Sequence, residues 1–162
     1  MMPVVIVPIR SFSGMARLSA VLDGTARADL IRRLGASALA AAEGAGATTA
    51  VVTADGEVGA WALDAGAEVV PDPGEGLNAA AAAGAEFAAG GPWVVLHGDL
   101  PGVHAADIAA LLDSLDDRPV LAPSKDGGTN AVAAVTQGFP FRFGPGSFRL
   151  HLAALRGEAR VV

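Results

Sequence analysis

The chain contains no cysteine and no tyrosine, and aromatic residues make up only 5% of it. Without cysteine, neither a disulfide framework nor a thiolate metal site can form. Because bulky aromatics are rare, alanine, valine and leucine must fill the interior, and helices can pack close to a sheet. The 162 residues, 52% of them hydrophobic, suffice for one core. We therefore expect a single domain over residues 1–162.

Positive charge and long apolar runs are also scarce. Eleven Lys and Arg stand against 17 Asp and Glu, which gives a net charge of −6. A nucleic-acid-binding protein needs a basic face to neutralise phosphates, so we expect no nucleic-acid partner. The N-terminus has no basic start like that of a secretion signal, and Glu and Gly interrupt the alanine-rich stretches. We expect a cytoplasmic protein with no membrane partner.

Short β-branched runs alternate with alanine-rich stretches that have helical spacing. Parallel strands need crossover connections, so this alternation predicts an α/β protein with a three-layer α/β/α, Rossmann-like architecture and a mostly parallel central sheet. Thr25 is a possible N-cap of the first helix. After residue 124 we expect two extended pieces around glycine turns. The expected strands are 3–9, 48–55, 68–72, 93–97, 118–124 and 158–162, and the expected helices are 25–46, 57–67, 77–90, 105–115 and 148–157.

A carboxylate, Asp99 in "HGDLPGV", follows the fourth expected strand. Ligands of open parallel sheets bind outside the carboxyl ends of the strands, so Asp99 is placed to face a ligand. Mg²⁺ accepts one or two carboxylates together with substrate phosphates, which makes Asp99 a candidate metal ligand. The alternative is that Asp99 caps the following turn or helix. The local sequence leaves both interpretations open.

The loop after the first strand, residues 9–18, carries Arg10 and Arg17 among small residues. Such a loop can present backbone N–H groups and guanidinium groups to a triphosphate. Neither G-x-x-x-x-G-K-[ST] nor G-x-G-x-x-G occurs in it, so the two common nucleotide motifs are absent. A solvated basic loop is an equally good interpretation.

Three glycine-containing turns are further candidates for ligand contacts. In "PGEGLNAA", Gly76 allows close backbone approach and the amide of Asn78 can read a base edge. "SKDGGTNA" and "RFGPGS" each lead into a hydroxyl, Thr129 and Ser147, and such hydroxyls can form an anion site with N–H groups. Helix entry and turn chemistry alone also explain these sequences. The three histidines have no metal-ligand spacing, and we interpret them as structural.

Five segments, taken in order, resemble one known family: "VPIRSFSGMARL", "GEGLNAA", "HGDLPGV", "GGTNA" and "FRFGPGSFRLH". They are similar to the 2-phospholactate and phosphoenolpyruvate guanylyltransferases, which make the phosphodiester precursor of the deazaflavin coenzyme F-420. The resemblance covers nearly the whole chain and implies a MobA-like nucleotidyltransferase fold. It also implies transfer of GMP from GTP to a phosphorylated three-carbon acid (2-phospholactate, phosphoenolpyruvate or 3-phosphoglycerate), with release of pyrophosphate. Members of this family often form homodimers.

The resemblance assigns roles to individual residues. Asp99 would bind Mg²⁺ and, with Arg17, support catalysis. The 9–18 loop would lie along the triphosphate, and the start of the 77–90 helix would border the guanine. The "GGTN" and "FGPGS" segments would hold the acid. The residues expected to bind GTP or the acid are Pro8, Arg10, Gly76, Leu77, Asn78, Thr129, Gly144 and Ser147.

The sequence departs from the family pattern in two places. Met15 occupies the position of a lysine in the family's A-K-[ST]-R-L stretch, so one cation is missing, and Arg10 or Lys125 would have to replace it. The chain also stops at "EARVV", before an acidic D-x-D-[TS]-P-x-D-L segment that supplies another metal ligand in the family. Two alternatives therefore stay open: a non-catalytic homologue that binds a nucleotide or phospho-acid, and a MobA-like transferase that uses a different nucleotide.

Overall fold

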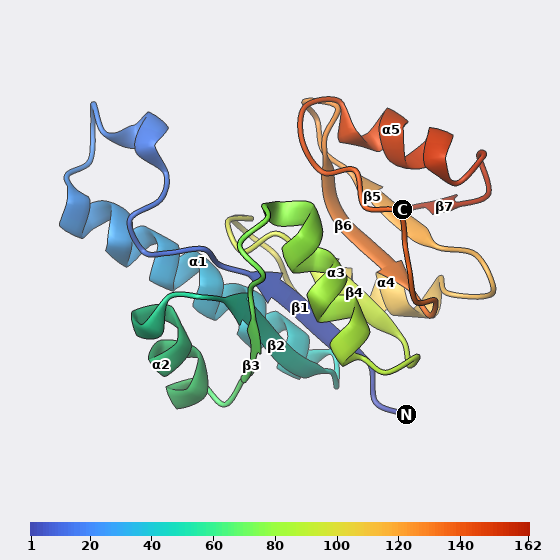
Figure 1. Ribbon diagram of the computed structural model, residues 1–162, viewed down its shortest axis with the longest axis horizontal. Helices are drawn as coiled ribbons and strands as arrows, with labels where there is room; N and C mark the ends of the chain where they lie inside the picture. Colours follow the sequence, from blue (N-terminus) through green and yellow to red (C-terminus); the bar gives the residue numbers. More distant parts are fainter.

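A computed structural model describes all residues, 1–162, and contains one seven-stranded sheet with helices on both faces (Figure 1). The strand order is β3-β2-β1-β4-β6-β5-β7. Only β6 runs against its neighbours, because it pairs antiparallel with both β4 and β5. The predicted mostly parallel sheet is therefore confirmed. The strands are β1 (Val4–Pro8), β2 (Thr48–Thr53), β3 (Glu68–Pro71), β4 (Trp93–Leu96), β5 (Val120–Pro123), β6 (Thr129–Ala134) and β7 (Arg160–Val161).

Five α-helices and one short 3-10 helix connect the strands. The first α-helix begins at Gly24, and its N-cap is Asp23, whose carboxylate accepts the N–H of Ala26 at 2.8 Å. The prediction that Thr25 is the N-cap was wrong because Thr25 already lies inside the helix. No helix is long and apolar enough to cross a membrane. The helices are η1 (Ala16–Leu18), α1 (Gly24–Gly44), α2 (Gly56–Asp64), α3 (Leu77–Phe87), α4 (Ala105–Asp113) and α5 (Ser147–Ala154).

Alternation along β1 shows how the sheet forms two cores. Val5 and Val7 pack into the cluster under α1, α2 and α4, whereas Val4 and Ile6 pack into the cluster under α3 and α5. Successive side chains of a strand point to opposite faces, so each central strand contributes to both clusters. The predicted three-layer α/β/α arrangement is confirmed, with α3 lying across the sheet face opposite to α1 and α4 (Figure 1).

Two glycines allow helices to contact the cores closely. A Cβ on Gly84 of α3 would lie 2.2 Å from Cγ2 of Ile6, and a Cβ on Gly35 of α1 would lie 2.9 Å from the ring of Trp61. No side chain larger than hydrogen fits at Gly84 unless the Ile6 side chain or α3 moves. The small-residue composition thus gives closely packed layers, which hold the loops at the carboxyl ends of the strands in place.

Between residue 124 and the start of α5, the chain contains one strand where two extended pieces were expected. The first piece is β6, and its two edges are already paired with β4 and β5. The second, around Phe139 and Phe141, forms no strand, and the N–H of Phe141 instead donates to the carbonyl of Phe139 at 2.9 Å. Both rings are buried against Trp93, with centroids 5.6 and 5.5 Å from it. The expectation of a second extended piece was wrong because aromatic burial, not strand pairing, holds this segment.

Candidate active site

The main pocket, of about 570 Å³, lies at the carboxyl ends of the strands and brings together segments distant in sequence. It is bounded by η1, the loop after β4, the β5–β6 turn and the start of α5. Six predicted site residues line it: Arg17, Leu77, Asp99, Thr129, Gly144 and Ser147. The position agrees with the rule that open α/β sheets bind ligands at this edge.

A side cavity of about 270 Å³ adjoins the main pocket. Three further predicted residues, Pro8, Arg10 and Gly76, line it. Leu77 borders both spaces. Two neighbouring compartments that share Leu77 in their linings can hold a ligand with two parts, or two ligands that meet near Leu77.

Asp99 lies exposed in the loop after β4, and no hydrogen bond engages its carboxylate. The following helix, α4, has His104 as its N-cap, and the N–H of His104 donates to Asp107 at 2.8 Å. The interpretation of Asp99 as a helix cap is therefore wrong. Asp99 is instead free to bind a cation.

The main pocket has few carboxylates, which suits a cation that takes most of its ligands from water and substrate phosphates. The chain contains no group of three or more His, Cys, Asp or Glu residues that could hold a metal ion. Asp99 and Asp126 are the acidic residues that line the pocket. Mg²⁺ typically keeps several waters and binds through one or two carboxylates plus substrate phosphates, so this sparse donor set fits Mg²⁺ with a bound nucleotide.

Two cationic side chains face the same pocket. Arg17 comes from η1 and Lys125 from the β5–β6 turn, and both are exposed. Hydrogen bonds from Ser124 and from the N–H of Gly128 lower the pKa of Asp126, and the charge of Arg17 adds a smaller effect in the same direction. The Arg17 guanidinium is thus close enough to the β5–β6 turn to act across the pocket. Together these cations can neutralise phosphate charge.

A second part of the pocket lining, called the hydroxyl wall below, is a buried hydroxyl pair. Oγ1 of Thr129 lies 3.0 Å from Oγ of Ser147 and 3.0 Å from Nδ1 of His151. The N–H of Arg142 donates to Nε2 of the same imidazole at 2.9 Å. Thr129 and Ser147 are only 4% and 1% exposed, and His151 is fully buried. This wall is therefore ordered by the protein itself, without a ligand.

Burial, the largest cause, lowers the pKa of His151 to about 4. The charges of Arg142 and His97 act in the same direction, while the Ser147 carbonyl opposes them. The imidazole is consequently neutral at physiological pH. His151 was interpreted as structural, and its contact with the hydroxyl pair was missed. One signal was available in the sequence, because Ser147 and His151 are four residues apart and so share a helix face.

Asn78 is the one predicted site residue that lies outside both the main pocket and the side cavity. Its Oδ1 accepts the N–H of Phe143 at 2.7 Å, and its Nδ2 donates to the Phe143 carbonyl at 3.4 Å. The amide that was expected to read a base edge is thus paired with the backbone. These two hydrogen bonds hold the start of α3 against the segment that carries Gly144, although Asn78 and Phe143 are 65 residues apart in the sequence.

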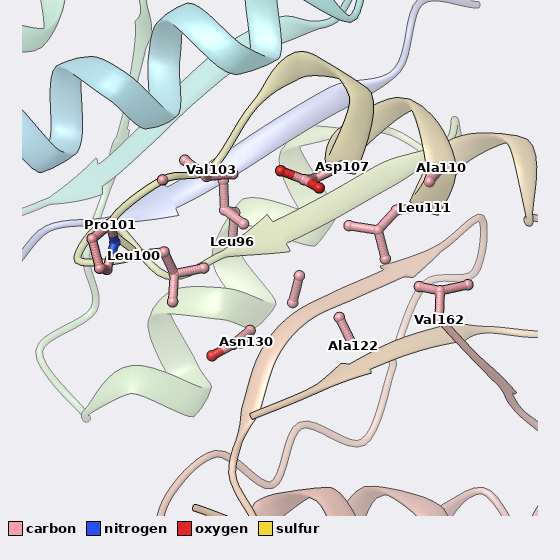
Figure 2. Close-up of a pocket in the computed structure, with 12 residues that line it drawn as sticks. Leu96, Leu100, Pro101, Val103, Asp107, Ala110, Leu111, Ala122, Asn130 and Val162 are labelled. Carbon is pink, nitrogen blue, oxygen red and sulfur yellow. The ribbon is translucent and has the colours of Figure 1, made fainter. Parts of the chain in front are cut away.

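A third hollow, of about 320 Å³, lies between α4 and strands β4 to β6 (Figure 2). It touches the main pocket at Leu100 and Asn130 but is lined mostly by apolar side chains. Its one charged residue, Asp107, already accepts a hydrogen bond from His104. With no cation and one carboxylate, this hollow does not suit a polyphosphate.

Comparison with known proteins shows that the chain is similar to guanylyltransferases. The family model described as "Guanylyl transferase CofC like" matches residues 3–160. A phosphoenolpyruvate guanylyltransferase of Rubrobacter xylanophilus is 40% identical over 166 residues, covering 96% of this chain and 81% of that protein. A 3-phospho-D-glycerate guanylyltransferase of Phenylobacterium zucineum is 38% identical over 156 residues, covering 88% and 71% respectively.

Solved structures show the same fold at lower sequence identity. A putative nucleotide-diphospho-sugar transferase from Desulfovibrio desulfuricans superposes with a TM-score of 0.79 at 15% identity, covering 100% of this chain and 80% of that one. The nucleotidyltransferase fold that the sequence predicted is therefore confirmed. From the family match and the identity to its curated relatives, the chain belongs to the CofC-like guanylyl transferase family.

Proposed function

We propose that this protein transfers GMP from GTP to a phosphorylated three-carbon acid and releases pyrophosphate, as a step in coenzyme F-420 biosynthesis. The observation that carries the proposal is one pocket with two different walls. Asp99 and Arg17 suit a metal-bound triphosphate, and the Thr129–Ser147 pair suits the anionic acid. The names of relatives at 40% and 38% identity, phosphoenolpyruvate and 3-phospho-D-glycerate guanylyltransferase, support this class of substrate.

The proposed reaction is an in-line displacement at phosphorus. A phosphate oxygen of the acid attacks the α-phosphorus of GTP, a new P–O bond forms, and the bond to the bridging oxygen breaks as pyrophosphate leaves. No side chain has to act as a nucleophile, so the protein contributes positioning and charge neutralisation. Asp99 would hold Mg²⁺, with Asp126 as a second carboxylate at the same pocket. When bound, the ion neutralises charge on the phosphates.

The two cavities suggest where each substrate binds. The side cavity, with Gly76 and Leu77 at its rim, would hold the nucleoside end of GTP, and Arg10 would meet the phosphates as they enter the main pocket. Thr129, Gly144 and Ser147 would hold the acid. In this arrangement the acid phosphate and the α-phosphorus meet in the main pocket near Asp99.

A pyrophosphate-release assay tests the proposal. The protein is incubated with GTP, Mg²⁺ and, in separate reactions, phosphoenolpyruvate, 2-phospholactate or 3-phosphoglycerate, with CTP as the matched control nucleotide. We expect pyrophosphate with GTP and at least one acid. Turnover with CTP alone would instead indicate a transferase that uses another nucleotide.

One observation favours a second function, nucleotide or phospho-acid binding without transfer. Met15, which stands where the family has a lysine, packs half-buried against the core under α1 and supplies no charge. If neither Arg10 nor Lys125 replaces that cation, the pocket would bind its ligands without catalysing transfer. GTP binding measured by calorimetry, with no pyrophosphate from any acid, would establish this alternative.

A further inference from the structure

His151 is a fully buried side chain that the proposed reaction does not use, although it touches the wall of the main pocket. Its two ring nitrogens have different partners. Nε2 lies 2.9 Å from the backbone nitrogen of Arg142, and Nδ1 lies 3.0 Å from Oγ1 of Thr129. A backbone N–H can only donate, so Nε2 must be the acceptor nitrogen. The hydrogen of the neutral ring is therefore on Nδ1, and Thr129 accepts it.

This tautomer determines what the hydroxyl pair offers to a ligand. Thr129 and Ser147 have two hydroxyl hydrogens, and one of them is used in the 3.0 Å hydrogen bond between the two oxygens. Because Nδ1 donates, the imidazole provides no acceptor for the other hydrogen. That hydrogen remains free to point into the main pocket. With the opposite tautomer, Nδ1 would accept it, and the pair would present only lone pairs to the pocket.

We infer that His151 is a positioning residue that keeps the Thr129–Ser147 pair a hydrogen-bond donor toward the anionic group of the acceptor acid. The inference rests on the proposed function for the identity of that acid. Hydrogen bonds to charged groups are stronger than neutral ones, so a pair that donates to a carboxylate or phosphate binds it, and a pair that presents lone pairs repels it. The low pKa of the buried imidazole agrees with a ring that stays neutral and keeps this tautomer.

The inference is tested with two variants of similar size, His151→Asn and His151→Leu. Both lose the acceptor for the Arg142 N–H, but the Asn amide can still donate to Thr129 and Leu cannot. We expect His151→Leu to raise the KM for phosphoenolpyruvate about 10-fold or more, because without the Nδ1–H donor nothing directs the free hydroxyl hydrogen of the pair toward the pocket. The KM of His151→Asn for phosphoenolpyruvate should stay within about 3-fold of the wild-type value. The KM for GTP should change less than about 2-fold in both, because the proposed function places the acid, and not GTP, on this wall.

A purely structural role predicts a different pattern, in which both variants raise both KM values or lower kcat together. Equal phosphoenolpyruvate KM values for the two variants, or a parallel rise in the KM for GTP, would overturn the inference. If the wild-type protein releases no pyrophosphate from any acid, the proposed function fails, and binding of phosphoenolpyruvate measured by calorimetry then replaces KM in the same comparison.

The tautomer is measured without any substrate. Long-range ¹H–¹⁵N correlation spectra of the imidazole distinguish a protonated Nδ1 from a protonated Nε2, and His151→Leu assigns the signal. We expect His151 to show a protonated Nδ1 and an unprotonated Nε2 at pH 7. A protonated Nε2 would refute the positioning role, whatever the outcome of the activity assays.

Discussion

The two walls of the main pocket are built in opposite ways. The hydroxyl wall, Thr129 and Ser147 in contact with His151, is at most 4% exposed, and each side-chain oxygen and ring nitrogen in this group has a hydrogen-bond partner. The phosphate wall, Asp99, Arg17 and Lys125, is exposed, and no hydrogen bond fixes the Asp99 carboxylate. Contacts within the protein organise the hydroxyl wall, whereas no such contact fixes the Asp99 carboxylate of the phosphate wall.

This difference corresponds to the chemistry expected of each wall. Choosing a small acid requires fixed donors, because discrimination depends on buried polar groups that a wrong ligand would leave unpaired. Neutralising a triphosphate requires charge, which acts over longer distances and tolerates movement. The hydroxyl wall should therefore affect folding stability and acid affinity, whereas the phosphate wall should affect turnover with little effect on stability.

The pH dependence of stability gives the largest expected effect on the hydroxyl wall. His151 has a pKa of about 4 in the folded protein, against 6.5 when unfolded. Between these values the unfolded chain binds a proton that the folded protein excludes. Stability from this residue is thus complete above pH 6.5 and falls by about 3 kcal/mol as the pH drops to 4.

Urea unfolding of the wild type and of His151→Asn between pH 7 and pH 4 measures that contribution. The charged groups that influence the ring are Arg142 and His97, and both remain in the variant. We expect the stability of His151→Asn to fall less steeply with decreasing pH than that of the wild type. If stability falls equally with pH in the two proteins, the conclusion that His151 is buried and neutral in the folded protein is wrong.

Asp99→Asn gives the largest expected effect on the phosphate wall. Removing the charge of a metal ligand should lower turnover about 100-fold or more, equivalent to about 2.7 kcal/mol. The free energy of unfolding should change by less than about 0.5 kcal/mol, because the side chain is exposed and unpaired. The matched control is Asp113→Asn, another exposed carboxylate, at the end of α4. Undiminished turnover in Asp99→Asn would contradict the proposed role of Asp99 as a metal ligand.

Asn78 tests whether its hydrogen bonds to the backbone of Phe143 hold the hydroxyl wall in place. Asn78→Ala removes the acceptor of the 2.7 Å bond and should lower stability by about 1–2 kcal/mol and raise the KM for the acid about 5-fold. Asn78→Asp keeps an acceptor at that position and loses only the longer bond, so its effect should be smaller. Equal effects of the two variants on the KM for the acid, measured by steady-state kinetics, would show that this hydrogen bond does not position the segment.

Met15→Lys gives the smallest expected effect. The lysine stem can keep the contacts that Met15 makes with the core while the ammonium extends to solvent near the loop. We expect GTP to bind about 5-fold more tightly, or about 1 kcal/mol, because one cation is added near the triphosphate. Met15→Gln, of similar length and no charge, is the control in the same calorimetric titration. No gain over Met15→Gln would show that residue 15 does not face the phosphates.

Much of the fold and of the phosphate wall could be predicted from the sequence. The β-branched runs and alanine-rich helices indicated the layers and the edge where Asp99 lies, because strand and helix periods are local properties. The reversed direction of β6 was not predictable from those periods, which carry no strand direction. The sequence predicted Thr25 as the N-cap of α1, whereas the structure shows Asp23. Both residue types cap helices, and the two residues lie two positions apart.

The hydroxyl wall was predicted only in part. Thr129 and Ser147 were recognised from their glycine turns and the resemblance, and the structure brings their hydroxyls within 3.0 Å. The roles of Asn78 and His151 depend on contacts with the backbone of Phe143 and Arg142. A residue type and its spacing do not show which distant backbone groups lack a partner, so those roles required the folded chain.

A crystal structure with a non-hydrolysable GTP analogue, Mg²⁺ and phosphoenolpyruvate tests the central claim most directly, because both walls are then seen with their ligands. The account predicts an ion between Asp99 and the triphosphate, with the acid on Thr129 and Ser147 in the same pocket. An acid bound elsewhere, or an Asp99 carboxylate directed away from any ion, would contradict it.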